Sequence, residues 1–446
     1  RTNTTPFQTT ARSDQGYGPM LTLTFITMIV LLALGFPMMV PLLVAALMLL
    51  FLVIDLGNVS LLMGQMISGV QSWALAAVPL FIFAADLMTR GHTANRLLDL
   101  VQSFVGHLRG GLPITTAASC TLFGAVSGST QATVVAMGGP MRPKLLEKGY
   151  SDKFSIALII NASDIALLIP PSIGMIIYGV ISGSSIGDLF IAGILPGLLI
   201  LLLFSIYCWV ASIRMGIAPE PKSDWATRLL ALRKALLPLG FPLVVVGGIY
   251  GGLFSPTEAA AIAVLYALIL EVVILRAVKL RELWDVALST GLITAVVFIL
   301  VAAGNAFTYA ISFAGIPQAI LDPVIASIGD NQTAVLALIA VSFFIGCMFV
   351  DPIVVILILT PLFKPAVEAA GLDPVHVGVI VTLQAAIGSA TPPFGCDIFT
   401  AMAIFRRPYF DVIRGTPPFI FILLIATVLL ILFPEISLWL PSLAQD

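Results

Sequence analysis

The chain consists of long apolar segments separated by short polar ones. Eight segments approach or exceed the length, roughly 20 residues, that a helix needs to cross the hydrocarbon core of a bilayer. These segments are residues 20–34, 38–54, 73–89, 187–213, 236–252, 257–275, 289–310 and 415–434. Apolar and polar positions do not alternate along them as they do in membrane β-barrels, and helices satisfy their own backbone hydrogen bonds in lipid. The pattern predicts an all-α protein with many membrane spans.

Two further segments have an apolar stripe at helical spacing and polar residues elsewhere. They are residues 91–109 and 316–329. This pattern is typical of an amphipathic helix lying in the plane of the membrane interface. A connecting helix packed on protein explains each segment equally well.

The composition agrees with a polytopic membrane protein in a lipid bilayer. Hydrophobic residues make up 59% of the chain and charged residues 10%, against about 25% charged in soluble domains. The net charge of −2 leaves no basic face for nucleic acid. Three histidines and four scattered cysteines form no metal-ligand motif, and no hydrolytic or P-loop motif lies in the apolar segments. We therefore expect no enzyme and no metal site built from these side chains.

Shifting the sequence by 222 positions reveals an internal repeat. The shift superimposes prolines and glycines, which fix backbone shape, so the coincidence indicates two copies of one supersecondary unit. The matched positions are Pro143 with Pro365, Gly149 with Gly371, Pro170-Pro171 with Pro392-Pro393, Gly193 with Gly415, and Pro196 with Pro418.

Basic residues predict that the two copies are inverted in the membrane, because cytoplasmic loops collect Lys and Arg. Residues 142–153 hold four bases and their repeat mate 364–376 holds one, whereas residues 406–414 hold three and their mate 183–193 none. The membrane topology that follows places 18 of the 21 Lys and Arg residues on the cytoplasmic side. It also predicts that both termini are periplasmic.

The repeat defines the domain organisation. We expect a polar N-terminal tail (1–19), a first inverted repeat (20–214), a cytoplasmic connector (215–235), a second inverted repeat (236–434) and a C-terminal tail (435–446). Each repeat contains a segment broken by polar residues, predicted as a re-entrant hairpin, followed by a helix split at its proline pair. The hairpins are predicted at 111–147 and 331–370, and the broken helices at 154–182 and 377–405.

The breaks are the candidate functional sites. Carbonyls freed at a half-helix C-terminus can coordinate a cation, and N–H groups freed at the next N-terminus attract an anion. Two cation sites are predicted, one between Ser127–Thr130 and 161–169, the other between 346–351 and 388–391. Ser129 and Ser172 are available to cap a helix or bind the anion. The alternative interpretation is that these breaks only kink the helices for packing and bind no ion.

Six acids fall within or beside apolar segments, where ionisable residues are costly and usually face a cavity. Asp164, Asp351 and Asp397 coincide with the breaks and are the functional candidates. Glu258, in the string SPTEAAA, is better explained as an acid at a helix N-terminus. Asp86 and Glu271 lie near helix ends and are expected to reach the headgroups.

With these residues identified, the chain resembles the large membrane subunit of TRAP (tripartite ATP-independent periplasmic) transporters, of the ion-transporter superfamily. The resemblance extends from about residue 60 to 430. It rests on strings that include SGSTQATVVAMGGPMRPKLLEKGYS, IPPS followed by GDLFIAGILPG, GGIYGGLFSPTEAAAIAVLYAL, ILILTPLFKPAVEAAGLDPVHVGVI and IGSATPPFG.

The resemblance implies sodium-coupled uptake of an organic acid across the bacterial inner membrane by an elevator motion. A periplasmic substrate-binding protein would deliver a carboxylate-bearing small molecule, and a small four-helix membrane subunit would brace the chain. The coupling ion would be Na+, and the solute would sit between the hairpin tips. The implied sodium ligands are Ser127, Gly128, Ser129 and Thr130 with Ser163, and Gly346, Asp351, Gly388 and Thr391. The candidate solute contacts are Ser129, Asp164, Ser172, Ser389 and Asp397.

The chain departs from the family at one point. The family commonly has a Gly-Thr-Leu-Gly-like string before Ile-Pro-Pro, whereas this chain has Ser163-Asp164-Ile165-Ala166. The added carboxylate has three possible roles: binding a cationic group of the solute, joining a sodium shell, or forming a buried pair. Two other functions are considered, a stand-alone ion-coupled anion carrier of the same superfamily and an intramembrane enzyme or scaffold.

Overall fold

The computed structural model describes residues 18–53, 59–319, 323 and 331–445, and every regular element in these ranges is a helix. Within them, seven helices are long and apolar enough to span a membrane. A further span is formed if α20 (Pro417–Leu432) and α21 (Glu435–Gln445), which meet at a 60° bend, are taken together. The expectation of an all-α, multi-span membrane protein is confirmed.

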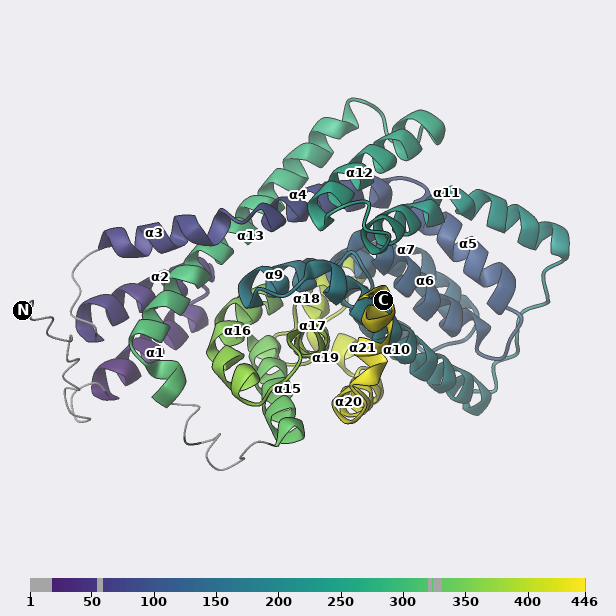
Figure 1. Cartoon of the computed structure of the whole chain (residues 1–446). Coiled ribbons are helices and arrows are strands. Elements are labelled where there is room, and N and C mark those ends of the chain that lie inside the picture. The colour runs from purple at the N-terminus through teal and green to yellow at the C-terminus, as the bar shows by residue number, and fades with distance from the viewer. Residues whose placement is uncertain (1–17, 54–58, 320–322, 324–330, 446) are drawn as a thin grey trace, which may run out of the picture.

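One group of helices packs around the long helix α13 (Glu282–Phe313), and we call this group the scaffold. Its N-terminal members are α1 (Gly18–Ala33), α2 (Met39–Met48), α3 (Val59–Val70) and α4 (Ala77–Arg90). Helix α13 contacts α2, α3 and α4 and runs past them in Figure 1. Helix α3 was not among the predicted spans, because Gly64, Gln65 and Ser68 interrupt its apolar pattern.

The scaffold is completed by α11 (Trp225–Tyr250) and α12 (Pro256–Leu268). Helix α12 packs on both α4 and α11. Its N-terminus has the expected form, since Ser255 and Glu258 make a reciprocal capping box. Because α11 begins at Trp225, the second half of the predicted connector 215–235 is helical.

The amphipathic segment 91–109 forms α5 (Thr93–Val105), which links the scaffold to the rest of the chain. Its apolar stripe, including Leu97, Leu98 and Val101, is buried against α6 and α11. The second amphipathic prediction, 316–329, lies mostly outside the described residues.

The expectation that Glu271 reaches the headgroups is wrong. Glu271 is fully buried in the π-helical turn that follows α12, and it accepts a 2.6 Å hydrogen bond from Thr93 Oγ1 at the start of α5. A carboxylate at that helix N-terminus complements its partial positive charge, so Glu271 joins α5 to the scaffold. Asp86 pairs with Arg90, at 3.1 Å, and both side chains are partly exposed.

Two helical hairpins form the centre of the molecule. The first consists of α6 (Gly111–Ser127) and α7 (Thr130–Glu147), and the second of α15 (Gln332–Phe349) and α16 (Pro352–Ala369). Each turn is two residues long, and the two helices of each hairpin contact one another. At the first turn Gly128 adopts the left-handed conformation, with φ +61°, which glycine tolerates without steric cost. At the second, Asp351 caps α16 and Pro352 begins it.

Two broken helices follow the hairpins. Helix α8 (Asp152–Ser163) ends in a 3-10 turn, and α9 (Ile173–Ser182) begins after the proline pair. In the second repeat, α17 (Pro374–Ser389) and α18 (Cys396–Phe405) are separated in the same way. The Pro170–Pro171 and Pro392–Pro393 bonds are both cis. We call the two hairpins and the two broken helices the core; in Figure 1, α9, α17 and α18 lie between the blue first hairpin and the light-green second hairpin.

The remaining helices connect and flank the core. Helix α10 (Ile186–Arg214) follows α9, and α19 (Tyr409–Ile413) leads from α18 to α20. The segment predicted as a C-terminal tail is helical as α21 and packs on α10. The order of hairpin and broken helix therefore occurs twice, at the spacing of the 222-residue repeat. The first copy continues in the single long helix α10 and the second in the bent pair α20 and α21.

Candidate functional site

A cavity of about 380 Å³ lies between the two hairpin tips. The first tip contributes Gly128 to Gln131 and the second contributes Asp351 to Ile353. The starts of α9 and α18 form another wall, and an apolar face of α13 closes the cavity on the scaffold side. The scaffold residues are Ile82, Leu292, Ile293, Val296, Val297 and Leu300. The cavity thus lies where core and scaffold meet.

The N-terminal ends of four helices border this cavity. Helices α7 and α16 begin at its two tips, and Ile173, Gly174 and Cys396 place the first residues of α9 and α18 in its wall. Unpaired N–H groups and the aligned peptide dipoles give each N-terminus a partial positive charge. Four such ends around one space favour an anionic group there.

Two of the N-caps are themselves part of the cavity wall. Ser129 accepts a hydrogen bond from the backbone N–H of Ala132 at 3.4 Å, and Asp351 accepts one from the N–H of Ile353 at 2.9 Å. The two caps occupy equivalent positions, 222 residues apart. Among the described residues that line the cavity, Asp351 is the one with an acidic side chain. Its negative charge therefore borders a site that is otherwise electropositive.

A buried carboxylate behind the cavity joins the two repeats. Asp397, which is fully buried, accepts hydrogen bonds of 2.8 Å from the hydroxyl groups of Thr130 and Ser389. Thr130 belongs to the first hairpin tip, whereas Ser389 and Asp397 lie on either side of the second helix break. The bond fixes the first tip against the broken helix of the opposite repeat.

Each hairpin tip also packs directly on a helix break. The carbonyl of Gly128 accepts a 3.4 Å hydrogen bond from the N–H of Ile173, and a Cβ at Gly128 would lie 2.2 Å from the carbonyl oxygen of Pro171. In the second repeat the N–H of Phe394 donates to the carbonyl of Met348 at 3.1 Å. These backbone contacts leave no room for a side chain at the first tip.

Four of the predicted site residues line the cavity: Gly128, Ser129, Thr130 and Asp351. The others are not among the residues that line it. Ser172 caps α9 by accepting from the N–H of Met175, and Ser127 exchanges a 2.9 Å hydrogen bond with Thr133.

The remaining predicted sodium ligands sit at packed helix contacts. Ser163 and Thr391 donate to the carbonyls one turn back in their own helices, at 2.7 Å and 2.6 Å. A Cβ at Gly388 would clash with Cys347 and one at Gly346 would crowd Val355, so both glycines permit close packing within the second repeat.

Asp164 does not line the cavity. It lies at the junction of α8 and the 3-10 turn, is 1% exposed, and neither carboxylate oxygen has a hydrogen-bond partner. This geometry does not support the expected contact between Asp164 and the solute.

Sequence reasoning missed several lining residues. Gln131 follows Thr130 in the polar string of the first tip. A polar side chain within an apolar segment could have identified it as a lining residue. Gly174 and Cys396 are related by the 222-residue shift and both fall in the first turn of the second half-helix. The apolar face of α13 could not be found, because nothing in a uniformly apolar helix marks the side that meets the core.

Two more cavities continue from this site along α9. The middle one, of about 340 Å³, is lined by Ile177 and Val180 of α9 and by Ser72, Asn305 and Thr308 of the scaffold. The outer one, of about 950 Å³, is lined by Gly179 and Val180 of α9, by Gly183 to Ser185 after it, and by the acids Asp188 and Glu258. Together the three cavities follow the seam between core and scaffold from the hairpin tips toward the loop after α9.

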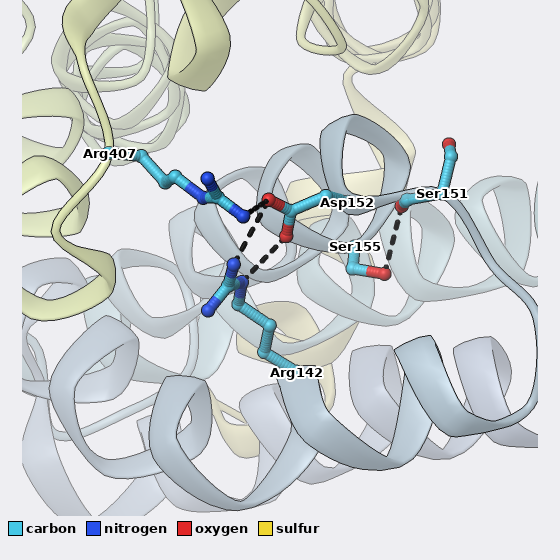
Figure 2. A network of polar contacts seen from close by, with 5 residues as sticks. All are labelled: Arg142, Ser151, Asp152, Ser155 and Arg407. Atoms are coloured by element: carbon cyan, nitrogen blue, oxygen red, sulfur yellow. Dashed lines mark hydrogen bonds and ion pairs between the residues drawn. The ribbon is translucent and has the colours of Figure 1, made fainter.

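A charged network lies at the opposite end of the core. Asp152, at the start of α8, accepts from Arg142 of α7 at 2.7 Å and pairs with Arg407 at 2.9 Å (Figure 2). Arg407 follows α18, so the network again joins the two repeats. The hydrogen bond from Arg142, supported by the charge of both guanidinium groups, lowers the pKa of Asp152 below its usual value.

Comparison with known proteins agrees with this geometry. Residues 25–436 match the family model described as the tripartite ATP-independent periplasmic transporter, DctM component. The chain is 63% identical to the ectoine TRAP transporter large permease protein TeaC of Halomonas elongata, over 95% of this chain and 100% of that protein. It is 61% identical to the ectoine/5-hydroxyectoine large permease UehC of Ruegeria pomeroyi, over 94% and 98%.

More distant proteins share the fold. The C4-dicarboxylate TRAP large permease DctM of Pseudomonas aeruginosa is 35% identical over 83% of this chain and 87% of its own length. Among solved structures, the YdaH transporter of Alcanivorax borkumensis has a TM-score of 0.62 at 15% identity, covering 95% of this chain and 98% of that chain. The architecture is therefore that of a membrane transporter.

Proposed function

The chain belongs to the DctM component family of tripartite ATP-independent periplasmic (TRAP) transporters, and we propose that it takes up ectoine or a closely related solute, driven by sodium. It is a multi-span membrane transporter, not an enzyme. The observation that carries the proposal is the cavity between the hairpin tips, at which four helix N-termini and one carboxylate meet.

The chemistry of ectoine matches that cavity. Ectoine is a small ring with one carboxylate and one delocalised amidinium cation, so it needs both an electropositive and an electronegative contact. The helix N-termini supply the first and Asp351 the second, while the apolar face of α13 covers the ring. A cavity of about 380 Å³ accommodates a solute of this size.

The degree of identity supports the choice of solute. Two relatives that carry ectoine in their names are more than 60% identical over nearly the whole chain, whereas a C4-dicarboxylate permease is 35% identical. A solute with two carboxylates also fits the cavity less well, because the second carboxylate would face Asp351.

Sodium coupling is part of the proposal. We place one ion at the first tip, with Ser127, Gly128, Ser129 and Thr130 and with Ser163 of α8, and one at the second, with Gly346, Asp351, Gly388 and Thr391. The helix breaks at these positions leave carbonyl oxygens without partners inside a helix, and hard cations prefer oxygen ligands. Movement of the core along the scaffold, an elevator motion, would carry solute and ions across together.

The partners follow from the same assignment. We expect a periplasmic binding protein to deliver the solute to the outer of the three cavities, and a small membrane subunit to brace the scaffold. The chain would lie in a bacterial inner membrane with both termini in the periplasm. A stand-alone carrier of the same superfamily, which needs neither partner, is the competing proposal.

Transport by the purified protein in lipid vesicles tests these points. The chain is reconstituted with the small membrane subunit of the same system, and uptake of radiolabelled ectoine is measured with the cognate binding protein outside. We expect accumulation under an inward sodium gradient and none under an equal potassium gradient. Succinate serves as the solute control.

Each result bears on a separate part of the proposal. Uptake of succinate but not ectoine would refute the solute assignment, and accumulation without sodium would refute the coupling. Equal uptake in the absence of the binding protein and the small subunit would favour the stand-alone carrier.

A further inference from the structure

A basic surface covers the end of the core at which the network of Figure 2 lies. It is formed by the start of α8 and by residues 406–414, which follow α18. The two segments are in contact, since Arg407 pairs with Asp152 at 2.9 Å and a Cβ on Gly415 would clash with the carbonyl oxygen of Lys153. We call this surface the basic patch, and it consists of Arg142, Asp152, Lys153, Arg406, Arg407, Phe410, Asp411 and Arg414.

The basic patch carries an excess of positive charge. Five of its residues are basic and two are acidic, which leaves a net charge of +3. Its exposed bases Lys153, Arg406 and Arg414 take part in none of the ion pairs within the described part of the chain. The adjoining end of α7, residues 144–148, adds two lysines and one glutamate. The protein itself therefore does not neutralise this surface.

An exposed aromatic side chain lies within the patch. Phe410 is 76% exposed. Its neighbour Tyr409 is anchored, because its ring packs on Phe399 at 6.4 Å and its hydroxyl donates a 2.9 Å hydrogen bond to the carbonyl of Pro393. A large apolar ring beside bases is unfavourable in water, but it suits the boundary between lipid headgroups and acyl chains.

The course of the chain places the patch at the surface of the membrane. Helix α18 runs from the second helix break to Phe405, and the strongly apolar α20 begins at Pro417. Residues 406–416 therefore connect two helices within the bilayer. Residues 148–151 connect α7 and α8 at the same end of the core, because α8 begins at Asp152.

We propose that the basic patch binds the headgroups of anionic phospholipids, with Phe410 inserted beside their acyl chains. A guanidinium group can donate two parallel hydrogen bonds to a phosphate. One anionic lipid supplies both the negative charge that the bases lack and the apolar cover for the ring. In the topology expected from the sequence this is the cytoplasmic leaflet, whose anionic lipids attract basic segments.

Binding at the patch has a consequence for transport. The patch belongs to the core, and the hydrogen bond from Tyr409 connects it to the second helix break. A lipid held there acts on the part of the protein that the elevator motion displaces, so anionic lipid should change the rate of uptake. This consequence rests on the proposed function, whereas the binding itself does not depend on the solute.

Lipid-dependent melting tests the binding. The protein is purified with the small membrane subunit in a neutral detergent, and its melting temperature is followed against added phosphatidylglycerol or phosphatidylcholine. We expect stabilisation by phosphatidylglycerol alone. In the double variant Lys153→Gln/Arg414→Gln, the phosphatidylglycerol concentration for half of the effect should rise about fivefold per base removed. Because both side chains are exposed, melting without lipid should match the wild type.

Matched variants distinguish a site from general attraction between charges. Arg233→Gln/Lys279→Gln removes two exposed bases from the scaffold side and should leave the response to phosphatidylglycerol unchanged. Asp411→Asn removes an exposed acid of the patch and should strengthen the response. Phe410→Ser changes no charge and should weaken it.

Two results would overturn the site. One is an equal response to phosphatidylglycerol in the wild type and the Lys153→Gln/Arg414→Gln variant. The other is an equal loss of response in the scaffold control, which would show that any base attracts the lipid.

Uptake into phosphatidylcholine vesicles, with and without a quarter of phosphatidylglycerol, tests the consequence for transport. The rate of ectoine uptake by the wild type should depend on the anionic lipid, and the Lys153→Gln/Arg414→Gln variant should lose this dependence. A wild-type rate that ignores the lipid would refute the consequence. Absence of ectoine uptake in all vesicles would instead overturn the solute assignment, and the melting measurements would still decide whether the patch binds lipid.

Discussion

Thr130 and Asp397, which are 267 residues apart, are joined by a buried 2.8 Å hydrogen bond between the first hairpin tip and the second broken helix. Ser389 donates to the other oxygen of the same carboxylate. The tip that borders the cavity is therefore held by the opposite repeat as well as by the helix break of its own repeat. The bond from Thr130 to Asp397 thus couples the two repeats directly beside the cavity.

Thr130→Val should destabilise the protein and impair transport. The substitution keeps the shape of the side chain but removes the donor, so that a buried carboxylate oxygen loses its partner at a cost of about 1–3 kcal/mol. We expect a lower melting temperature in detergent and slower uptake. Thr130→Ser retains the hydroxyl group and should approach the wild type; equal stability of the Val and Ser variants would show that the bond contributes nothing.

Gly128→Ala should abolish uptake, because the new Cβ would lie 2.2 Å from the carbonyl oxygen of Pro171 and would separate the hairpin tip from the helix break. Gly149→Ala is the matched control. Gly149 also has a positive φ, +98°, but nothing lies within 4 Å of its Cβ position, so that variant has only the backbone cost of about 1–2 kcal/mol. Uptake and melting temperature are measured for both. Comparable transport by the two variants would contradict the importance of this contact.

Much of the fold could be predicted from the sequence because prolines and glycines mark it. The pairs Pro170-Pro171 and Pro392-Pro393 located both helix breaks, and the polar string after Ser127 located a hairpin tip. These features are local, since a missing N–H or a missing Cβ changes the backbone wherever it occurs.

The side-chain partners could not be predicted in the same way. The bond from Thr130 to Asp397 and the bond from Thr93 to Glu271 join residues that are far apart in the sequence. A stretch of apolar residues does not show which face of a helix meets the core. The contribution of α13 to the cavity could therefore not be predicted from the sequence. Asp164 was recognised as unusual, but its exclusion from the cavity depends on the direction in which the 3-10 turn leaves α8.

Asp152→Asn should lower stability in a pH-dependent way. The hydrogen bond from Arg142 lowers the pKa of Asp152 below its usual 3.8. A group with a lowered pKa stabilises the folded state at every pH above its unfolded value, and the contribution is lost as the pH falls through the folded value. The melting temperatures of wild type and Asp152→Asn should therefore differ at pH 7 and begin to converge only below about pH 4.

Asp99→Asn provides the control for this measurement, because Asp99 has no ion pair in the described part of the chain. Its melting temperature should follow that of the wild type at each pH. A difference between wild type and Asp152→Asn that persists unchanged at low pH would show that the network of Figure 2 acts through packing and not through charge.

Asp351→Asn should weaken binding of a solute that carries a positive group. The amide oxygen of Asn can still accept from the N–H of Ile353 and cap α16, so the substitution removes the charge and keeps the local structure. We expect the KM for ectoine to rise about tenfold, which corresponds to about 1.4 kcal/mol. A ring carboxylate of similar size without the cation should be a poor substrate of the wild type, and the variant should discriminate less between the two solutes. Because Asp351 is also a proposed sodium ligand, the sodium dependence of uptake should shift in the variant as well. An equal rise of the KM for both solutes would show that Asp351 acts only through the bound ion and that the amidinium lies elsewhere in the cavity.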